Sequence, residues 1–316
     1  MIATLTLNPS LDLTASLKKI DYKDINRIRG IQKDPGGKGL NISRIIHRLK
    51  GDTVALGFAG GDTGKKIREL LNADGVKNRF VRIKGENRSN ITVEIRNDPR
   101  QIKINEDGPA VNRKEISSLM RCISVLSEGD FLVMSGSIPP GVPQDIYARM
   151  INIAHRNKVR TVLDADGEAF YTGLRARPFM IKPNIYEAQR VLEKMNRRPA
   201  KICCEKDLFS AASMFVKAGV GTAVISWGHK GIVAASGGKF WRARVPVRLK
   251  ETRVGAGDAV IAGFVHSLSL GRKIEDCIRW GIACGTASAF EKGTRLCKPE
   301  KVRELVGRVK VEQVSF

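Results

Sequence analysis

The sequence predicts an α/β fold in which helices cover both faces of a mainly parallel sheet. Short runs rich in β-branched residues alternate with helical patterns along almost the whole chain, as expected for parallel strands joined by crossover helices. The 316 residues are 42% hydrophobic, which suffices for one sizeable core. No internal repeat, low-complexity tract or linker interrupts this pattern, so we expect a single domain over residues 1–316.

Strands are expected where short apolar runs lie between turn residues. These runs cover residues 2–7, 54–58, 131–135, 161–164, 179–182, 222–226 and 231–235. Helical patterns separate most of them. Between residues 41 and 50, for example, apolar side chains recur at helical spacing, and Gly51 supplies a C-terminal stop signal.

Two stretches of the chain lack helical patterns. Residues 11–33 and 87–107, with approximate bounds, alternate as strands do. We expect antiparallel strands from these two segments to form a small β-sheet lid beside the main sheet. Such a lid could close over a site and exclude water from it.

The composition is strongly basic. There are 55 Lys and Arg residues against 32 Asp and Glu residues, which gives a formal net charge of +23. Such a charge suits an acidic partner such as a nucleic acid. The basic residues are dispersed, however, and aromatic residues do not interleave with them, so we expect no specific nucleic-acid partner. A general basic bias together with a phosphorylated substrate is the interpretation that we favour.

The cellular location is predicted from two features of the sequence. The N-terminus does not read as a signal peptide, and no apolar run approaches the roughly 18–20 residues that span a bilayer. We therefore expect no membrane partner. The six cysteines show no metal-type spacing with the four histidines, and we expect them to be buried, reduced thiols. Reduced thiols favour the cytoplasm.

The most informative stretch is Gly255-Ala256-Gly257-Asp258, which precedes a helical pattern over residues 259–270. Its small residues allow the backbone to approach a phosphate, and N–H groups at a helix N-terminus point toward such a ligand. Asp258, at the same helix start, can take a proton from an acceptor hydroxyl during phosphoryl transfer. A glycine-rich turn with an ordinary N-capping aspartate is the alternative interpretation.

Other motifs that resemble known sites fail in detail. Residues 60–66 lack the first glycine and the final Ser or Thr of a nucleotide-binding P-loop, because Ala59 and Lys66 occupy those positions. Val260 breaks a dinucleotide-binding fingerprint. The sequence contains neither G-x-S-x-G nor H-E-x-x-H, which disfavours hydrolases and metalloproteases.

Two further segments bear on the predicted site. A second glycine-rich turn, at residues 35–41, leads into a helix and offers Lys38 and Asn41 as polar contacts for a polyhydroxy ligand. Asn184 and Glu187 are three residues apart and so share a helix face. That face could hold water around Mg²⁺ near nucleotide phosphates, or it could simply cap the helix.

Together these motifs resemble those of the pfkB (ribokinase-like) carbohydrate kinases, in the phosphofructokinase and tagatose-6-phosphate kinase branch. The resemblance covers essentially the whole chain and begins with Thr-Leu-Asn-Pro-Ser-Leu-Asp at residues 6–12. It continues through residues 26–28, 34–39, 88–90, 104–109, 135–141, 164–169, 182–187, 226–231 and 254–258. It implies a ribokinase-like three-layer sandwich with a β-sheet lid, and a homodimer that forms through that lid.

The resemblance also implies roles for individual residues. Asp258 matches the general base, and the amides of Gly255, Ala256 and Gly257 match the anion hole. The positions that match sugar-phosphate contacts are Asp12, Gly37, Lys38, Asn41, Arg88 and Ser137, with Arg27 as a further candidate. The positions that match ATP contacts are Lys182, Asn184, Glu187, Ser226, Gly228, Gly231, Ala283 and Cys284.

The resemblance implies ATP and Mg²⁺ as cofactors. Glu187 and Asn184 would hold the magnesium ion indirectly, through water. K⁺ is a further candidate ion, although Arg253 departs from the small or hydroxyl residue that the family often has at that position.

The implied reaction is transfer of the γ-phosphoryl group of ATP to a hydroxyl of a ketohexose phosphate. Fructose 1-phosphate, which would give fructose 1,6-bisphosphate, is the leading acceptor because of the patterns at residues 26–27, 104–109 and 309–312. Residues 293–297 resemble the minor 6-phosphofructokinases, so fructose 6-phosphate is the alternative, followed by tagatose 6-phosphate. A remote alternative is a basic nucleic-acid-binding protein that keeps a kinase fold.

Overall fold

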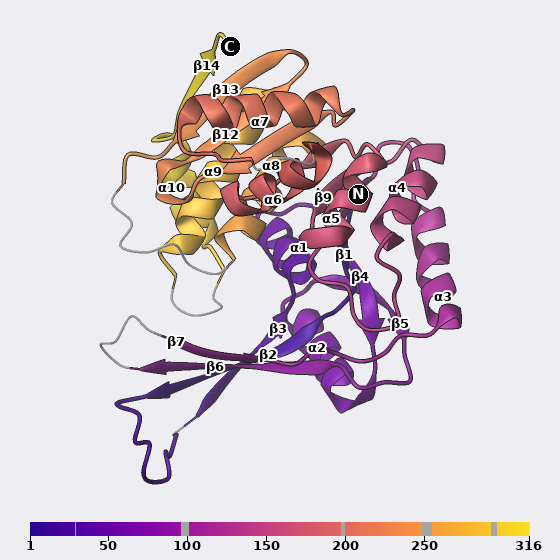
Figure 1. Ribbon diagram of the computed structural model, residues 1–316. Helices are drawn as coiled ribbons and strands as arrows, with labels where there is room; N and C mark the ends of the chain where they lie inside the picture. The colour runs from indigo at the N-terminus through magenta and orange to yellow at the C-terminus, as the bar shows by residue number, and fades with distance from the viewer. Residues whose placement is uncertain (29, 96–100, 197–199, 248–254, 292–295) are drawn as a thin grey trace.

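The computed structural model describes residues 1–28, 30–95, 101–196, 200–247, 255–291 and 296–316. These residues form a large α/β body, from which a smaller sheet projects as a lid (Figure 1). The body contains a ten-stranded sheet and the lid a four-stranded one.

Seven adjacent strands of the main sheet are parallel. In spatial order they are β5 (Lys77–Arg82), β4 (Thr53–Ala59), β1 (Ile2–Thr6), β8 (Phe131–Ser135), β9 (Arg160–Asp164), β10 (Met180–Ile181) and β11 (Thr222–Ser226). Three antiparallel strands continue the sheet: β12 (Ile232–Ser236), β13 (Lys239–Arg244) and β14 (Lys310–Val314). The central strands β1 and β8 are buried along their whole length, as expected for a sheet covered on both faces.

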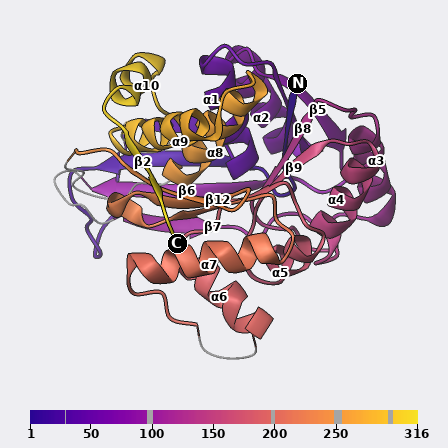
Figure 2. The same ribbon diagram turned by 90° about the horizontal axis from the view of Figure 1, so that it is seen from above.

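Helices pack on both faces of this sheet (Figure 2). On one face lie α1 (Lys38–Arg48), α2 (Gly61–Ala73), α8 (Ala256–Ser269), α9 (Ile274–Ala289) and α10 (Pro299–Val306). On the other lie α3 (Arg113–Ser124), α4 (Ile146–Arg156), α5 (Gly167–Arg175), α6 (Ile185–Asn196) and α7 (Glu205–Lys217). Buried apolar side chains fill both interfaces, so the predicted three-layer sandwich is confirmed.

The lid consists of two hairpins. Its strands lie in the order β3 (Ile31–Gly36), β2 (Ser10–Leu17), β6 (Arg88–Ile95) and β7 (Gln101–Asn105). The pairs β2–β3 and β6–β7 are antiparallel, as predicted, but β2 and β6 pair in parallel. Both of these strands follow parallel strands of the main sheet, β1 and β5, and leave its carboxyl edge in the same direction. The prediction that all lid strands are antiparallel is therefore wrong.

Two helices begin three residues earlier than the sequence predicts. Helix α1 starts at Lys38 because Gly37, with φ 123°, turns the chain directly out of β3 in a conformation that side chains disfavour. Helix α8 starts at Ala256 after Gly255, whose φ is 87°. Asp258 therefore lies within the first turn of α8 rather than ahead of it.

Strand boundaries also differ from the prediction. Strand β10 has only two residues, because Pro178 and Pro183 flank it and proline has no N–H to donate to a ladder. Strands β5, β13 and β14 were not predicted. The strands β5 and β14 are the edges of the main sheet and carry charged side chains, which removes the apolar pattern on which strand prediction depends.

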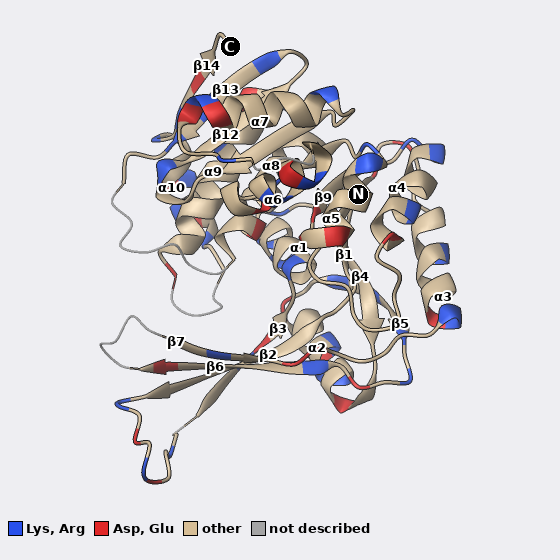
Figure 3. Ribbon diagram, in the orientation of Figure 1, with Lys and Arg blue, Asp and Glu red and all other residues tan. Residues whose placement is uncertain are grey.

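The charge distribution agrees with the prediction of dispersed basic residues. Lys and Arg occur on elements throughout the body and the lid, interspersed with acidic residues (Figure 3). Within the described ranges, no helix is both long and apolar enough to cross a membrane. All six cysteines are free, but only Cys277, Cys284 and Cys297 are buried. Cys203 and Cys204 are exposed just before α7, which corrects the expectation that all the thiols are buried.

Candidate active site

The predicted base, Asp258, lies in the first turn of α8 and is only 5% exposed. The first N–H groups of this helix have no intrahelical acceptor, so the amides at Ala256 and Gly257 are available to an anion. Asn41, on α1, donates a hydrogen bond from Nδ2 to Oδ2 of Asp258 at 3.0 Å. Burial, and next the negative charge of Asp164, raise the pKa of Asp258 to about 6. A carboxylate with that pKa can act as a general base near neutral pH.

Two lysines converge on Asp164, the last residue of β9. Nζ of Lys38 lies 3.2 Å from Oδ2 of Asp164, and Nζ of Lys182 lies 3.2 Å from Oδ1. Ser135 donates from Oγ to Oδ2 at 2.8 Å. Burial opposes ionisation of Asp164, but the charges of Lys182 and Lys38 outweigh it and hold its pKa at about 2. The structure thus places an ionised, fully buried carboxylate between two predicted site lysines.

Sequence reasoning assigned no role to Asp164, although it lies in one of the family-like stretches. Only the fold brings Lys38 and Lys182, which are 144 residues apart in sequence, to the same carboxylate. Lys182 also lies beside the predicted anion hole, since a methyl group at Gly257 would be 3.2 Å from Nζ of Lys182. An aspartate at the end of a buried strand would not reveal this by its spacing alone.

Asp12, on β2, lies where the lid joins the body. Its Oδ1 accepts hydrogen bonds from Oγ of Ser10 at 2.7 Å and from Nδ2 of Asn90 at 3.0 Å. Burial raises the pKa of Asp12 despite these bonds. The glycine turn before α1 passes directly over this carboxylate, because a methyl group at Gly36 would lie 2.2 Å from Oδ1. At Gly37, the next residue, a methyl group would lie 2.6 Å from Cγ2 of Thr6, so the turn packs closely against β1.

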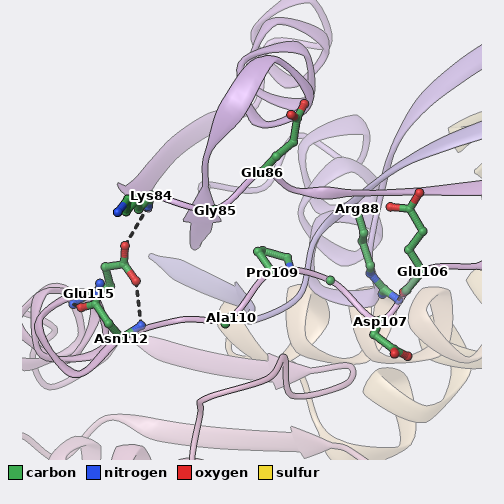
Figure 4. A pocket seen from close by; sticks show the side chains of 11 residues that line it. Lys84, Gly85, Glu86, Arg88, Glu106, Asp107, Pro109, Ala110, Asn112 and Glu115 are labelled. Carbon is green, nitrogen blue, oxygen red and sulfur yellow. Dashed lines mark hydrogen bonds between the residues drawn. The ribbon is translucent and has the colours of Figure 1, made fainter.

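Arg88, the first residue of β6, is held by the backbone of two other segments. Nε and Nη2 donate to the carbonyl oxygen of Asn8 at 3.3 and 3.1 Å, and Nη1 donates to that of Glu106 at 3.0 Å. Arg88 lines an open groove of about 720 Å³ between the connections that join β6 and β7 to the body (Figure 4). The position of its guanidinium is therefore tied to the base of the lid.

Ser137 lies close to this group, with its Oγ 3.5 Å from Nδ2 of Asn8. Arg27 does not. It is exposed in the connection between β2 and β3, and within the described part of the chain it forms no hydrogen bond or ion pair with the other substrate candidates. The structure thus brings together Asp12, Lys38, Asn41, Arg88 and Ser137 but leaves Arg27 on the lid.

A cavity of about 300 Å³ adjoins the anion hole. The predicted residues that line it are Asn184, Ser226, Gly228, Gly231, Ala256 and Gly257. The rest of its wall is mainly apolar and includes Val247, Val260, Ile282 and Ala289. An apolar slot that leads to backbone amides fits a flat base with its phosphates directed toward α8.

Ala283 and Cys284 do not line this cavity, contrary to the prediction. Both are fully buried in the core between α8 and α9, and a methyl group at Gly263 would lie 2.7 Å from Sγ of Cys284. Their neighbours Ile282 and Thr286 face the cavity instead. The prediction failed because residues 283 and 284 lie on a different face of helix α9 from residues 282 and 286.

Asn184 and Glu187 form a helix cap. Oδ1 of Asn184 accepts from the N–H groups of Tyr186 and Glu187 at 2.9 Å, and Oε2 of Glu187 accepts from the N–H of Asn184 at 2.8 Å. The capping interpretation is therefore the one that the structure shows. Oε1 of Glu187 accepts no hydrogen bond from the described residues, so this oxygen could accept one from a metal-bound water. The side-chain oxygen of Asn184 is already used by two N–H groups of the helix.

Comparisons with known proteins point to one family. The sequence profile of the pfkB family of carbohydrate kinases matches residues 5–301. The chain is 37% identical over 99% of both chains to the 1-phosphofructokinase of Borreliella burgdorferi. It is 32% identical, over 99% of its length and all of the relative's, to the tagatose-6-phosphate kinase of Staphylococcus epidermidis. The structure of phosphofructokinase-2 from Escherichia coli in complex with potassium superposes with a TM-score of 0.90 at 30% identity, over 97% of this chain and 98% of that one.

Proposed function

Because this chain belongs to the pfkB family of carbohydrate kinases, we propose that it phosphorylates fructose 1-phosphate to fructose 1,6-bisphosphate with ATP. That it is an ATP-dependent sugar-phosphate kinase follows from the family and from its full-length similarity to phosphofructokinases. The observation on the molecule that supports the reaction best is the buried carboxylate of Asp258 in the first turn of α8, beside free backbone amides. We also propose that residues 1–316 form a single kinase domain.

Asp258 would act as the base. The acceptor hydroxyl binds at the carboxylate, Asp258 removes its proton, and the resulting oxygen attacks the γ-phosphorus while the bond to ADP breaks. The amides of Gly255, Ala256 and Gly257 stabilise the charge on the transferring group. Lys38 and Lys182, held by Asp164, add positive charge on either side.

The sugar phosphate would bind between the base of the lid and the start of α1. Asp12 and Asn41 offer hydrogen-bonding groups to sugar hydroxyls. The half-buried guanidinium of Arg88 suits the phosphate of the acceptor, with Ser137 nearby. This arrangement selects a phosphorylated sugar over a neutral one.

The nucleotide would occupy the cavity between the β11–β12 turn and α9. Ser226, Gly228 and Gly231 line one side, and Ile282 and Thr286 take the adenine-facing role first assigned to Ala283 and Cys284. Glu187, through Oε1 and water, is the residue that would hold Mg²⁺, and Asn184 would fix Glu187 in place. Bound Mg²⁺ neutralises charge on the nucleotide phosphates.

The acceptor is tested by initial rates of ADP release with ATP and Mg²⁺. The four acceptors are fructose 1-phosphate, fructose 6-phosphate, tagatose 6-phosphate and fructose. We expect the highest kcat/KM with fructose 1-phosphate. A preference for fructose 6-phosphate or tagatose 6-phosphate would support a sugar-phosphate kinase with a different acceptor from the one proposed. Turnover of unphosphorylated fructose alone would refute the role of Arg88 in binding the acceptor phosphate.

We further propose that the chain forms a homodimer through the lid. Ile31, Ile91, Ile102 and Ile104 lie on the lid strands and are 39–55% exposed, and strand pairing sets Ile91 directly opposite Ile104. A second copy of this apolar face would cover it. Ile104→Lys should give monomers in sedimentation equilibrium, whereas Val125→Lys, at an exposed site on the body, should leave the dimer intact. An Ile104→Lys dimer would refute this interface.

Two other features remain proposals. We place the enzyme in the cytoplasm, where free thiols such as the exposed Cys203 and Cys204 stay reduced. K⁺ is proposed as an activating ion because the similar Escherichia coli structure is in complex with potassium. Arg253, which bears on this point, lies outside the described residues. Rates measured in K⁺ and Na⁺ at equal ionic strength test the proposal.

A further inference from the structure

Asp164 connects the two halves of the site. Lys38, one of its partners, is the first residue of α1 and follows the glycine turn that passes over Asp12. Lys182, the other partner, lies beside Gly257 in the anion hole. Each lysine contacts a different oxygen of the same carboxylate, at 3.2 Å in both cases. One side chain therefore fixes a cation on the sugar side and a cation on the nucleotide side.

We propose that Asp164 is a positioning residue for phosphoryl transfer, which sets the separation of the Lys38 and Lys182 ammonium groups and shields the base from their charge. Three features of its geometry support this role. The carboxylate is 1% exposed, so water does not compete with the lysines for its oxygens. Ser135 fixes its orientation by donating to Oδ2 at 2.8 Å. Its two oxygens have separate partners, which defines the distance between those partners.

The shielding follows from the signs of the charges. Lys38 and Lys182 both favour the ionised form of Asp258, and each therefore weakens it as a base. Asp164 acts in the opposite direction and is, after burial, the largest contribution to the raised pKa of Asp258. The amide of Asn41, which donates a hydrogen bond to Asp258, is neutral and so does not offset the charges of the lysines. Without Asp164, two uncompensated ammonium groups would face the base.

The inference rests on the proposed role of Asp258 as the base, and the test separates the two. Asp164→Asn keeps the shape of the side chain and removes its charge. We expect kcat to fall on the order of 100-fold, as for a small displacement of catalytic groups. We also expect the acidic limb of the kcat/KM profile to move to lower pH by on the order of one unit. The substrate phosphate also ionises near pH 6, but it does so equally with both enzymes.

Ser135→Ala is the matched control, because it removes a hydrogen bond to the same carboxylate and keeps the charge. Its acidic limb should stay at the wild-type pH. A folded Asp164→Asn enzyme with wild-type kcat and an unmoved limb would overturn the proposal. So would a limb that stays in place while the Mg²⁺ requirement rises, since Asp164 would then serve the metal rather than the lysines.

Lys38→Met gives a second test if Asp164→Asn does not fold. Lys38→Met removes one partner of the buried Asp164 carboxylate, but Lys182 still pairs with it, so its charge keeps a cation. The pKa of Asp258 should rise, which ¹³C NMR of aspartate-labelled free enzyme measures without turnover, with the Asp258 signal identified by its loss in Asp258→Asn. An unchanged or lower pKa would refute the coupling. The role of Asp258 as base is tested independently, by whether Asp258→Asn is inactive.

Discussion

Nδ2 of Asn41 donates a hydrogen bond to Oδ2 of Asp258 at 3.0 Å, which links helices α1 and α8 across 217 residues of sequence. The bond occupies Oδ2, so in the proposed reaction Oδ1 would face the acceptor hydroxyl. It also favours the ionised form and so opposes the effect of burial on the pKa of Asp258. Asn41 thus constrains the orientation of the Asp258 carboxylate and lowers the pKa of the proposed base.

The first prediction concerns this hydrogen bond. Asn41→Ala removes a donor to the ionised carboxylate, so the pKa of Asp258 should rise and the acidic limb of kcat/KM should move to higher pH. This direction is opposite to that expected for Asp164→Asn. Rate profiles between pH 5 and 9 measure the shift, with Asn78→Ala as a control on the body surface. A shift to lower pH would contradict the assignment.

Removal of the proposed base should strongly lower turnover but leave nucleotide binding intact. Asp258→Asn should lower kcat by about 10²–10⁴-fold, because general base catalysis contributes on that order. The Kd of ATP, measured by calorimetry, should stay within about threefold of wild type, since Asp258 does not line the nucleotide cavity. Near-normal turnover would show that another group accepts the proton.

The same variant should be more stable than wild type when no ligand is bound. The pKa of Asp258 is raised by folding, so its ionisation opposes the folded state above pH about 6, by up to roughly 3 kcal/mol. Asp258→Asn should therefore raise the free energy of unfolding at pH 8. The gain should vanish below pH about 4, where Asp258 is protonated in both states. Urea unfolding at the two pH values measures it, and equal differences would refute the raised pKa.

Arg88→Lys tests recognition of the acceptor phosphate. Lysine keeps the positive charge but lacks the planar guanidinium group. In Arg88 that group donates to two backbone carbonyl oxygens and has further N–H groups for a phosphate. The KM for the sugar phosphate should rise about 10–100-fold, which corresponds to the loss of one or two charge-assisted hydrogen bonds. The KM for ATP should not change. Arg82→Lys, at an exposed position on β5, is the control, and equal effects of the two would argue against a specific role.

Gly39→Ala tests the close approach of α1 to β1. A methyl group there would lie 2.5 Å from Oγ1 of Thr6 and 2.6 Å from the backbone oxygen of Leu5. The substitution should destabilise the fold by about 1–3 kcal/mol, as overpacking does. Gly307→Ala, where a methyl group meets nothing within 4 Å, should leave the melting temperature unchanged. A Gly39→Ala protein with the wild-type melting temperature would show that α1 can move away from β1.

Much of this protein was determined by local sequence. Alternation of strand and helix patterns predicted the layered fold, because residues that bury both sides of a strand or one side of a helix must be apolar at fixed spacing. The stretch that ends in Asp258 fitted either a base or an N-capping aspartate at a helix start, and the resemblance to pfkB kinases favoured the base. Predictions failed where local signals were absent, as at the charged edge strands β5 and β14.

Tertiary structure decided what the spacing of residues could not. The meeting of Lys38 and Lys182 at Asp164 depends on the start of α1 and the ends of β9 and β10, which lie together only in the folded protein. The helical phase of α9 decided that Ile282 and Thr286, rather than Ala283 and Cys284, face the nucleotide cavity. The raised pKa of Asp258 likewise comes from burial and from charges distant in sequence. The residue types are known from the sequence, whereas the distances between side chains and the removal of water from charged groups arise only when the chain folds.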